Sequence, residues 1–166
     1  VLDAGCGEGI YSLAVLRAIE KAGKHGKLLG VDISKTALQY ASKRSPDFTL
    51  CVASCAHLPV EDGSVDEVLN IFSPFVPEEF ARVLKPGGTF CGCFYVAGEC
   101  RRTDRLIKKV YEPMKFFTPP YETVQSLKAR LEEMYADVQL GNVKSIAWFV
   151  CKKVKYAEKM EKGHHE

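Results

Sequence analysis

The sequence has no Cys-x-x-Cys pair, although 7 cysteines are spread over its 166 residues. Zinc ribbons and disulfide frameworks both need cysteines in paired spacing, so the sequence favours reduced thiols and predicts no metal site. Four of these cysteines, Cys51, Cys91, Cys93 and Cys151, fall within apolar runs. A free cysteine in such a run behaves as a small buried hydrophobe, so we predict that these four thiols pack in the core.

Long apolar runs are also missing, since none approaches the roughly 20 residues that a membrane-spanning helix needs. The chain starts on an apolar strand that turns into glycines, without the basic leader of a signal peptide. We therefore expect a cytoplasmic protein. Hydrophobic residues make up 46% of the chain and charged residues 27%, which excludes general disorder. We predict one domain over residues 1–155 and a charged tail over residues 156–166.

Net charge is small, at +2, but the basic excess lies in the C-terminal half of the chain. One short run holds much of it, namely Arg101, Arg102, Arg105, Lys108 and Lys109. A solvated helix face is the ordinary explanation of such a run. The alternative is a positive rim that attracts an anionic substrate, such as a phosphate ester or an RNA backbone.

Strand and helix patterns alternate along the first part of the chain. Apolar runs and turn residues predict strands over 1–4, 27–33, 48–53, 65–72, 89–96, 138–143 and 146–151. Helical spacing predicts helices over 10–22, 34–44, 77–84, 103–111 and 123–135. Alternation implies parallel strands with crossover helices, whereas the last two strands are joined too tightly for a helix. We predict an open, mostly parallel α/β sheet with helices on both faces and an antiparallel edge hairpin.

The most informative segment is Asp3-Ala4-Gly5-Cys6-Gly7-Glu8-Gly9, where a strand ends, three glycines alternate and a helix begins. Glycines at such a turn let backbone amides approach a ligand closely. A dinucleotide fold has Gly-x-Gly-x-x-Gly, whose third glycine would fall at Ile10. The spacing Asp-x-Gly-x-Gly-x-Gly instead resembles motif I of the class I S-adenosylmethionine-dependent methyltransferases. A glycine turn with a capping acid is the alternative.

Asp32 supports the resemblance, because it ends the second predicted strand, 23 residues after Gly9. This is close to the offset of about 20 residues at which an acid reaches ribose hydroxyls in such folds. A carboxylate and two vicinal hydroxyls form a charge-assisted pair of hydrogen bonds. The alternative is that Asp32 only caps the next helix, a role for which Ser34 competes.

The resemblance implies S-adenosylmethionine as the cofactor and a Rossmann-like, seven-stranded sheet. Asp3 would then bind the ammonium group of the cofactor through charge and hydrogen bonds. Ser54 stands where many family members carry Asp, so the Ser54 hydroxyl or a nearby backbone group would recognise the adenine amino group. The cofactor-binding residues implied by the resemblance are Asp3, Gly5, Cys6, Gly7, Asp32, Ile33, Ser54, Cys55 and Asn70.

The segment from Asn70 to Pro74 follows the fourth predicted strand, near which the family places its methyl-accepting atom. Asn70 and Ser73 are therefore the candidate acceptor-side residues. No side chain stands out as a general base, although His57, Tyr11 and Tyr95 could each move a proton. The aromatic and proline run over 116–121 is either the wall of a substrate pocket or a surface loop packed on the sheet.

Two narrower resemblances lead to different acceptors. The segments 53–59 and 70–74 resemble rRNA (guanine-N1) methyltransferases, whereas the chain after Gly88 is more similar to type-11 methyltransferases related to ubiquinone biosynthesis. We expect an enzyme that methylates an unidentified small molecule. An RNA methyltransferase domain without its zinc module is the alternative, and a non-catalytic module that binds S-adenosylmethionine is a further one. The oligomeric state is left open.

Overall fold

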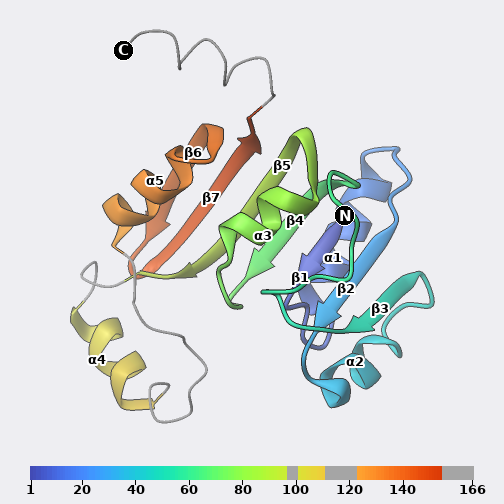
Figure 1. The fold of residues 1–166 in the computed structure, drawn as a ribbon. Coiled ribbons are helices and arrows are strands. Elements are labelled where there is room, and N and C mark those ends of the chain that lie inside the picture. The colour runs from blue at the N-terminus through green and yellow to red at the C-terminus, as the bar shows by residue number, and fades with distance from the viewer. Residues whose placement is uncertain (97–100, 111–122, 155–166) are drawn as a thin grey trace, which may run out of the picture.

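The computed structural model describes residues 1–96, 101–110 and 123–154, which form a seven-stranded sheet with helices packed on it (Figure 1). The strands are β1 (Leu2–Ala4), β2 (Leu28–Asp32), β3 (Phe48–Val52), β4 (Val65–Ile71), β5 (Leu84–Tyr95), β6 (Tyr135–Val143) and β7 (Ile146–Lys153). The helices are α1 (Ile10–Lys21), α2 (Lys35–Ala41), α3 (Pro77–Val83), α4 (Arg101–Val110) and α5 (Val124–Glu132).

The strand order is β3-β2-β1-β4-β5-β7-β6. Strands β1 to β5 pair in parallel, while β7 is antiparallel to both β5 and β6. The predicted α/β sheet with an antiparallel edge hairpin is therefore confirmed. From β1 the chain winds outward to β3 and then returns to β4, so the order reverses between β1 and β4. Ligands of open α/β sheets bind beyond the carboxyl ends of the strands at such a switch point.

Local signals explain where the helices begin. Gly9 precedes α1 in a left-handed conformation, with φ of 76°. The Ser34 hydroxyl accepts a hydrogen bond from the Ala37 N–H at the start of α2, and Thr123 does the same for Ser126 in α5. Pro77 occupies the first turn of α3, where its missing N–H costs no hydrogen bond.

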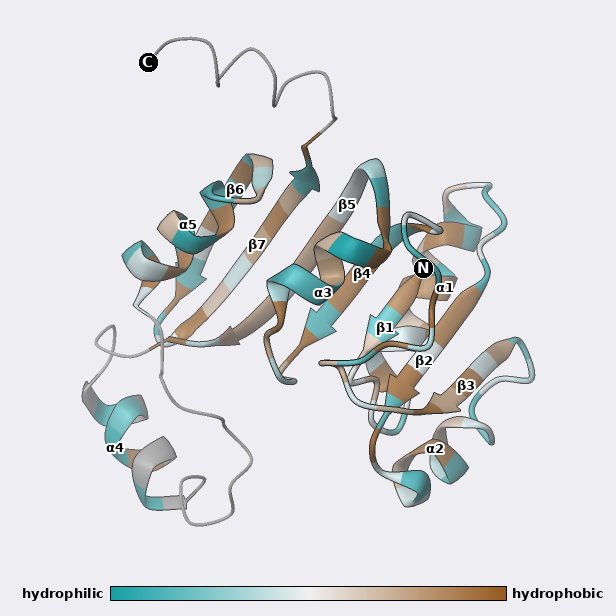
Figure 2. Ribbon diagram, in the orientation of Figure 1, coloured by the Kyte–Doolittle hydropathy of each residue, from teal (hydrophilic) through white to brown (hydrophobic). Residues whose placement is uncertain are grey.

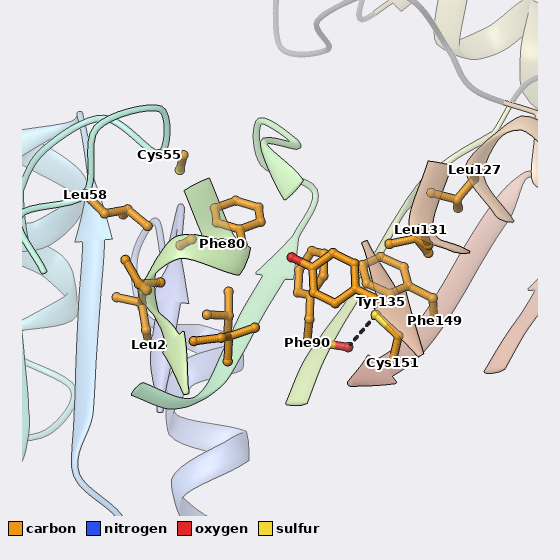
Figure 3. Packing of buried hydrophobic residues seen from close by; sticks show 14 of the residues in the cluster. Leu2, Cys55, Leu58, Phe80, Phe90, Leu127, Leu131, Tyr135, Phe149 and Cys151 are labelled. Atoms are coloured by element: carbon orange, nitrogen blue, oxygen red, sulfur yellow. Dashed lines mark hydrogen bonds between the residues drawn. The ribbon is translucent and has the colours of Figure 1, made fainter. Parts of the chain in front are cut away.

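Apolar residues run along most strands of the sheet, as the brown stretches of the ribbon in Figure 2 show. On one face of the sheet they form the core together with residues of α3 and α5. Phe90 of β5 lies at the centre of this core, fully buried, with ring contacts to Phe75, Phe80, Tyr135 and Phe149. Figure 3 shows Tyr135 and Phe149 packed around Phe90, with the Cys151 thiol hydrogen-bonded to the Phe90 carbonyl. Helix α1 lies on the opposite face, where Ser12 bonds Asp3.

Several boundaries differ from the predicted ones by up to five residues, and the starts of β5 and β6 are the two that involve the core. β5 begins at Leu84, before the Pro86-Gly87-Gly88 turn, because Leu84 already pairs with Val65 before the register shifts. Tyr135 starts β6 instead of ending a helix, since its ring is buried in the core and its hydroxyl donates to the Pro77 carbonyl. Both differences depend on partners distant in the sequence.

The predicted core thiols divide into two groups. Cys151 is fully buried, whereas Cys51, Cys91 and Cys93 are only partly buried. The charged tail over 156–166 and the aromatic and proline run over 116–121 lie outside the described residues. Within the described residues, no helix combines the length and apolar character needed to cross a bilayer. The cytoplasmic location stays a prediction.

Phe90→Ala tests the central role of the aromatic cluster. We expect it to lower the free energy of unfolding by about 3–5 kcal/mol, because it leaves a large cavity among four rings. Tyr40→Ala is the matched control, since Tyr40 is 53% exposed on α2 and should change stability by less than about 0.5 kcal/mol. Urea unfolding followed by fluorescence measures both. If both variants lost the same free energy of unfolding, this account of the core would be contradicted.

Candidate functional site

The glycine-rich loop after β1 is tied to the end of β2. The N–H groups of Gly5 and Cys6 both donate to the Val31 carbonyl, at 2.7 and 3.0 Å. The Gly7 N–H donates to one carboxylate oxygen of Asp32 at 2.9 Å, and the Ser34 N–H donates to the other at 2.8 Å. Asp32 therefore fixes the position of both loops. A carboxylate has about four lone-pair sites, so Asp32 keeps capacity for further donors.

Gly5 and Gly7, two of the three glycines in this loop, differ in the space around them. A Cβ added at Gly7, where φ is +53°, would meet no atom within 4 Å. A Cβ added at Gly5 would instead overlap the side chain of Ser73, which belongs to the loop after β4. Gly7 thus leaves open space that a ligand could fill, while Gly5 lets the loops after β1 and β4 touch.

Two acids, Asp3 and Asp32, lie close to this loop. Asp3 is only 2% exposed, and its carboxylate accepts a hydrogen bond from Ser12 Oγ at 2.5 Å. The pKa of Asp3 is raised to about 6, mainly by burial, and the nearby charge of Asp32 acts in the same direction. Within the described part of the chain, neither acid forms a salt bridge with a lysine or arginine. The surroundings of the glycine-rich loop are therefore electronegative.

The two acids also raise the pKa values of two nearby thiols, those of Cys6 and Cys55. Burial is the main reason why the pKa of Cys6 is raised to about 12 and that of Cys55 to about 11, and both acids add to each shift. The Cys6 sulfur packs over Gly30 of β2, and the Cys55 sulfur lies near Gly5. These neutral, buried thiols are packing groups, so of Cys6 the backbone is the part that a ligand could contact.

Large apolar side chains are exposed along the same edge of the sheet. Ile33 follows β2 and is 74% exposed, and Phe72 follows β4 and is 40% exposed. The others next to the carboxyl ends of β1 and β3 are Ile10, Tyr11 and Val52. Organic ligands bind in sites lined mainly by apolar groups with a few placed polar ones. The combination of exposed apolar side chains and two acids fits such a site.

Ser54 follows β3 and is exposed. Its hydroxyl oxygen accepts a hydrogen bond from the Ala56 N–H at 3.2 Å, which leaves the hydroxyl proton and one lone pair for a ligand. Ser54 and Ile33 thus lie at the ends of the neighbouring strands β3 and β2, on the side of the sheet away from β4.

Asn70 and Ser73 fasten the loop after β4 to the end of β1. Asn70 is fully buried, and its amide nitrogen bonds the Ala4 carbonyl at 3.0 Å, Ser73 Oγ at 2.5 Å and the Pro74 carbonyl at 3.2 Å. Ser73 Oγ also donates to the Ala4 carbonyl, at 2.6 Å. Both side chains therefore act first as ties between the two loops at the switch point.

The three candidate general bases lie apart from the hydrogen bonds that Asn70 and Ser73 form. Tyr95 is nearly buried, and its hydroxyl donates to Asp104 of α4 at 2.5 Å. Tyr11 is exposed in the first turn of α1, and His57 is exposed beside Ser54. Among the described residues, none of the three bonds Asn70 or Ser73.

Sequence reasoning missed an ion cluster that holds the loop after β3. Arg82 of α3 donates to the carbonyls of Leu58 and Val60 and pairs with Glu79 and Asp62. The Leu58 N–H donates to Glu79 at 2.7 Å, and the Arg82 guanidinium is the main cause that lowers the pKa of Glu79 to about 2. The only signal was the spacing of Glu79 and Arg82 on one helix face, which is common on solvated helices.

A family model described as a methyltransferase domain matches residues 1–88. The chain belongs to this methyltransferase family. The match covers more than half of the chain and contains the glycine-rich loop, Asp32, Ser54 and Asn70. The predicted resemblance to class I S-adenosylmethionine-dependent methyltransferases is confirmed, and with it the cofactor of the family.

Curated relatives of this methyltransferase domain act on different acceptors. A 23S rRNA (guanine(748)-N(1))-methyltransferase of Streptomyces fradiae is 40% identical over 90 residues, which are 54% of this chain and 31% of that protein. A demethylmenaquinone methyltransferase of Oceanobacillus iheyensis is 35% identical over 99 residues, which are 52% of this chain and 40% of that protein. The chain thus matches about a third of the length of these relatives.

Solved structures extend the likeness over the whole methyltransferase fold. Geranyl diphosphate C-methyltransferase from Streptomyces coelicolor has a TM-score of 0.69 at 15% identity, covering 93% of this chain and 71% of that one. The methyltransferase domain of the citrinin polyketide synthase has a TM-score of 0.74 at 16% identity, covering 93% and 46%. At such low identity these structures confirm the fold, including the seven-stranded sheet.

The stability of the methyltransferase domain should depend on Asp3. Because the folded state raises the pKa of Asp3 from 3.8 to about 6, this carboxyl favours folding at low pH. That contribution is complete below pH about 4 and is lost as the pH rises through about 6. Asp3→Asn keeps an oxygen for Ser12 and has no charge, so it should remove the dependence.

We expect the Asn variant to gain stability relative to the wild type on the order of 2 kcal/mol between pH 4 and pH 7. Urea unfolding of the ligand-free chain at both pH values measures the difference. A constant difference between the two proteins would contradict the raised pKa of Asp3.

Proposed function

We propose that this domain binds S-adenosylmethionine at the carboxyl edge of β1, β2 and β3 and transfers its methyl group to an acceptor beside β4. The observation that carries the proposal is the pair of uncompensated acids, Asp3 and Asp32, at a glycine turn with open space over Gly7. Such a turn suits a nucleoside ligand, and the two acids decide which kind.

Charge favours a sulfonium nucleoside over a dinucleotide. The pyrophosphate of a dinucleotide is an anion, which two nearby carboxylates would repel. S-adenosylmethionine carries an ammonium and a sulfonium, and either cation would be attracted to the negative charge of Asp3 and Asp32. The remaining lone pairs of Asp32 suit two ribose hydroxyls, and the exposed Ile33 offers an apolar surface to the adenine ring. The residues present therefore fit this cofactor.

When bound, the cofactor supplies an activated methyl group with a good leaving group. The chain then has to bind both partners and hold the accepting atom about 3–3.5 Å from the methyl carbon. The loop from Phe72 to Pro74 adjoins the cofactor loop through Ser73 and Gly5, so it is suited to orient the acceptor. Asn70 keeps that loop in place, and no described side chain is assigned the role of general base.

A small organic acceptor is the first candidate. The apolar side chains exposed at this edge, including Ile33 and Phe72, suit an organic ligand better than a polyanion. The demethylmenaquinone methyltransferase relative is named for an acceptor of this kind.

An RNA acceptor is the second candidate, and one surface favours it. Arg102, Arg105 and Lys109 are exposed on α4 at a spacing that brings them onto one helix face. The helix is anchored through Asp104, which accepts hydrogen bonds from Tyr95 at the end of β5 and from Ser145. Phosphate groups could pair with this stripe, and the rRNA methyltransferase relative is 40% identical over its match. A non-catalytic role would require cofactor binding without turnover on any acceptor.

Gly7→Ala tests the cofactor site. The added methyl group would occupy the open space over the loop, so we expect the affinity for S-adenosylmethionine to fall at least about tenfold, or roughly 1.4 kcal/mol. Gly23→Ala is a matched control, because Gly23 also has a positive φ and open space around its Cα, but follows α1. Isothermal titration calorimetry with S-adenosylmethionine measures binding by both variants.

Both substitutions should cost similar stability, since each forces Ala into a left-handed conformation. Equal affinity of the two variants for the cofactor would contradict the role of the loop. Tight binding of a nicotinamide dinucleotide by the wild type, with no heat from S-adenosylmethionine, would contradict the cofactor assignment itself.

Salt dependence distinguishes the two acceptor classes. We expect methyl transfer from labelled S-adenosylmethionine to a reduced naphthoquinone in a panel of small molecules, with little change between 50 and 200 mM salt. If a 23S rRNA transcript is the acceptor, transfer should fall steeply over that range as phosphate contacts are lost. Arg105→Gln should then weaken transfer, while Lys24→Gln, beyond α1, should not. Transfer to RNA alone would overturn the small-molecule proposal.

A further inference from the structure

Phe72 has an unusual backbone conformation at the switch point. Only three described residues other than glycine have a positive φ, and Phe72 is one of them, at 49°. The others, Asp137 at 54° and Lys144 at 55°, lie at the irregular part of β6 and in the turn between β6 and β7. Bulges and hairpin turns account for those two polar residues. Phe72 lies in neither, and an aromatic residue in the left-handed region is strained.

The surrounding contacts hold Phe72 in this conformation. Its N–H donates to the Cys93 carbonyl of β5 at 2.9 Å. On the other side, Asn70 bonds the Pro74 carbonyl, and Ser73 is bonded to the Ala4 carbonyl and packed on Gly5. Strained backbone persists where neighbouring contacts over-determine it, and such residues cluster at functional sites.

The Phe72 ring is not part of the aromatic core. Phe75, Phe90, Phe94 and Phe149 contact one another, whereas no described ring packs against Phe72. The side chain is 40% exposed, directly after β4 and beside the loop that carries Gly5. A strained backbone that leaves an aromatic ring exposed at the switch point is hard to explain by packing alone.

We propose that Phe72 is an acceptor-stacking residue and that the acceptor presents a flat, π-bonded ring to it. This inference rests on the proposed methyl transfer and narrows its substrate class. Aromatic rings gain from offset stacking on other π systems, and the preference depends little on which planar ring is offered. A saturated acceptor would not gain in this way. Asn70 and Ser73 are positioning residues in this arrangement, because they hold the loop that carries the ring.

The cofactor and the acceptor then occupy different sides of the switch point. The acids and Gly7 lie at the ends of β1 and β2, while Phe72 lies at the end of β4. Asn70 and Ser73 join the two sides through one carbonyl, that of Ala4. Loss of the Phe72 ring should therefore weaken acceptor binding without changing cofactor binding.

Calorimetry on the full chain saturated with S-adenosylhomocysteine tests the proposal. The flat probes are guanosine monophosphate and 1,4-naphthoquinone, and their non-planar counterparts are ribose 5-phosphate and cyclohexane-1,4-dione. We expect at least one flat probe to bind, and Phe72→Leu to weaken it about tenfold. Phe72→Tyr keeps the ring face and should stay within about twofold of the wild type.

Three controls separate stacking from damage to the fold. The affinity for S-adenosylhomocysteine should be the same in all variants, as should the melting temperature of Phe72→Leu and Phe72→Tyr within a few degrees. Tyr40→Leu, an exposed aromatic on α2, should leave the flat probe bound normally.

Several results would overturn the proposal. They are equal binding of the flat probe by the wild type and Phe72→Leu, equal binding of flat and saturated probes, or no binding of either flat probe to the loaded chain. A chain that fails to bind S-adenosylhomocysteine would instead contradict the proposed function, on which this inference rests.

Discussion

The carboxyl end of β1 is the joint on which the rest of the site depends. Strand β1 has only three residues, yet its end and the following loop are held from both sides. On one side Val31 and Asp32 bind the N–H groups of the glycine-rich loop, and on the other Asn70 and Ser73 bind the Ala4 carbonyl. Since these bonds join loops that are far apart in sequence, they set the spacing between the two halves of the site.

Two residues beside this joint lower the stability of the ligand-free chain. A buried carboxylate without a cation is unfavourable, and so is an aromatic residue in a left-handed conformation. Asp3 and Phe72 show these two features on either side of the joint. At pH 7 neither stabilises the ligand-free chain, because a neutral side chain in place of Asp3 and a glycine in place of Phe72 would be more stable there. A bound cation beside Asp3 and a stacked ring on Phe72 would offset both costs.

The sequence predicted most of the fold because local patterns and the packing agree. Ser34 caps α2 and Pro77 opens α3 as their positions indicate, and the glycine turn lies between β1 and α1. The start of β5 at Leu84 and of β6 at Tyr135 could not be predicted, since both depend on partners on other strands and helices. Long-range pairing of this kind overrides local propensity.

The site residues that the motifs select stay a prediction, and only some of their contacts could be foreseen from the sequence. Motif spacing selected Gly7 and Asp32, which the fold brings within hydrogen-bonding distance. It gave no sign that Ser73 would fill the space beside Gly5 or that Arg82 would hold the loop after β3, because each contact joins segments that the chain order separates. A spacing pattern within one βα unit indicates which ligand that unit can bind. It carries no information on how loops from distant parts of the sequence hold the unit in place.

Because motif spacing describes only local units, it identifies the methyltransferase family of the chain and does not identify the methyl acceptor. The family match ends at residue 88, and β1 to β4, whose carboxyl ends form the proposed cofactor and acceptor edge, lie before that point. The residues that we propose for cofactor binding therefore lie in the part of the chain that the family model matches. Beyond it lie α4, α5 and the hairpin of β6 and β7, which the family model does not match. Acceptor specificity has to be sought in the shape and chemistry around β4 and α4, where Phe72 combines a left-handed backbone with a partly exposed ring.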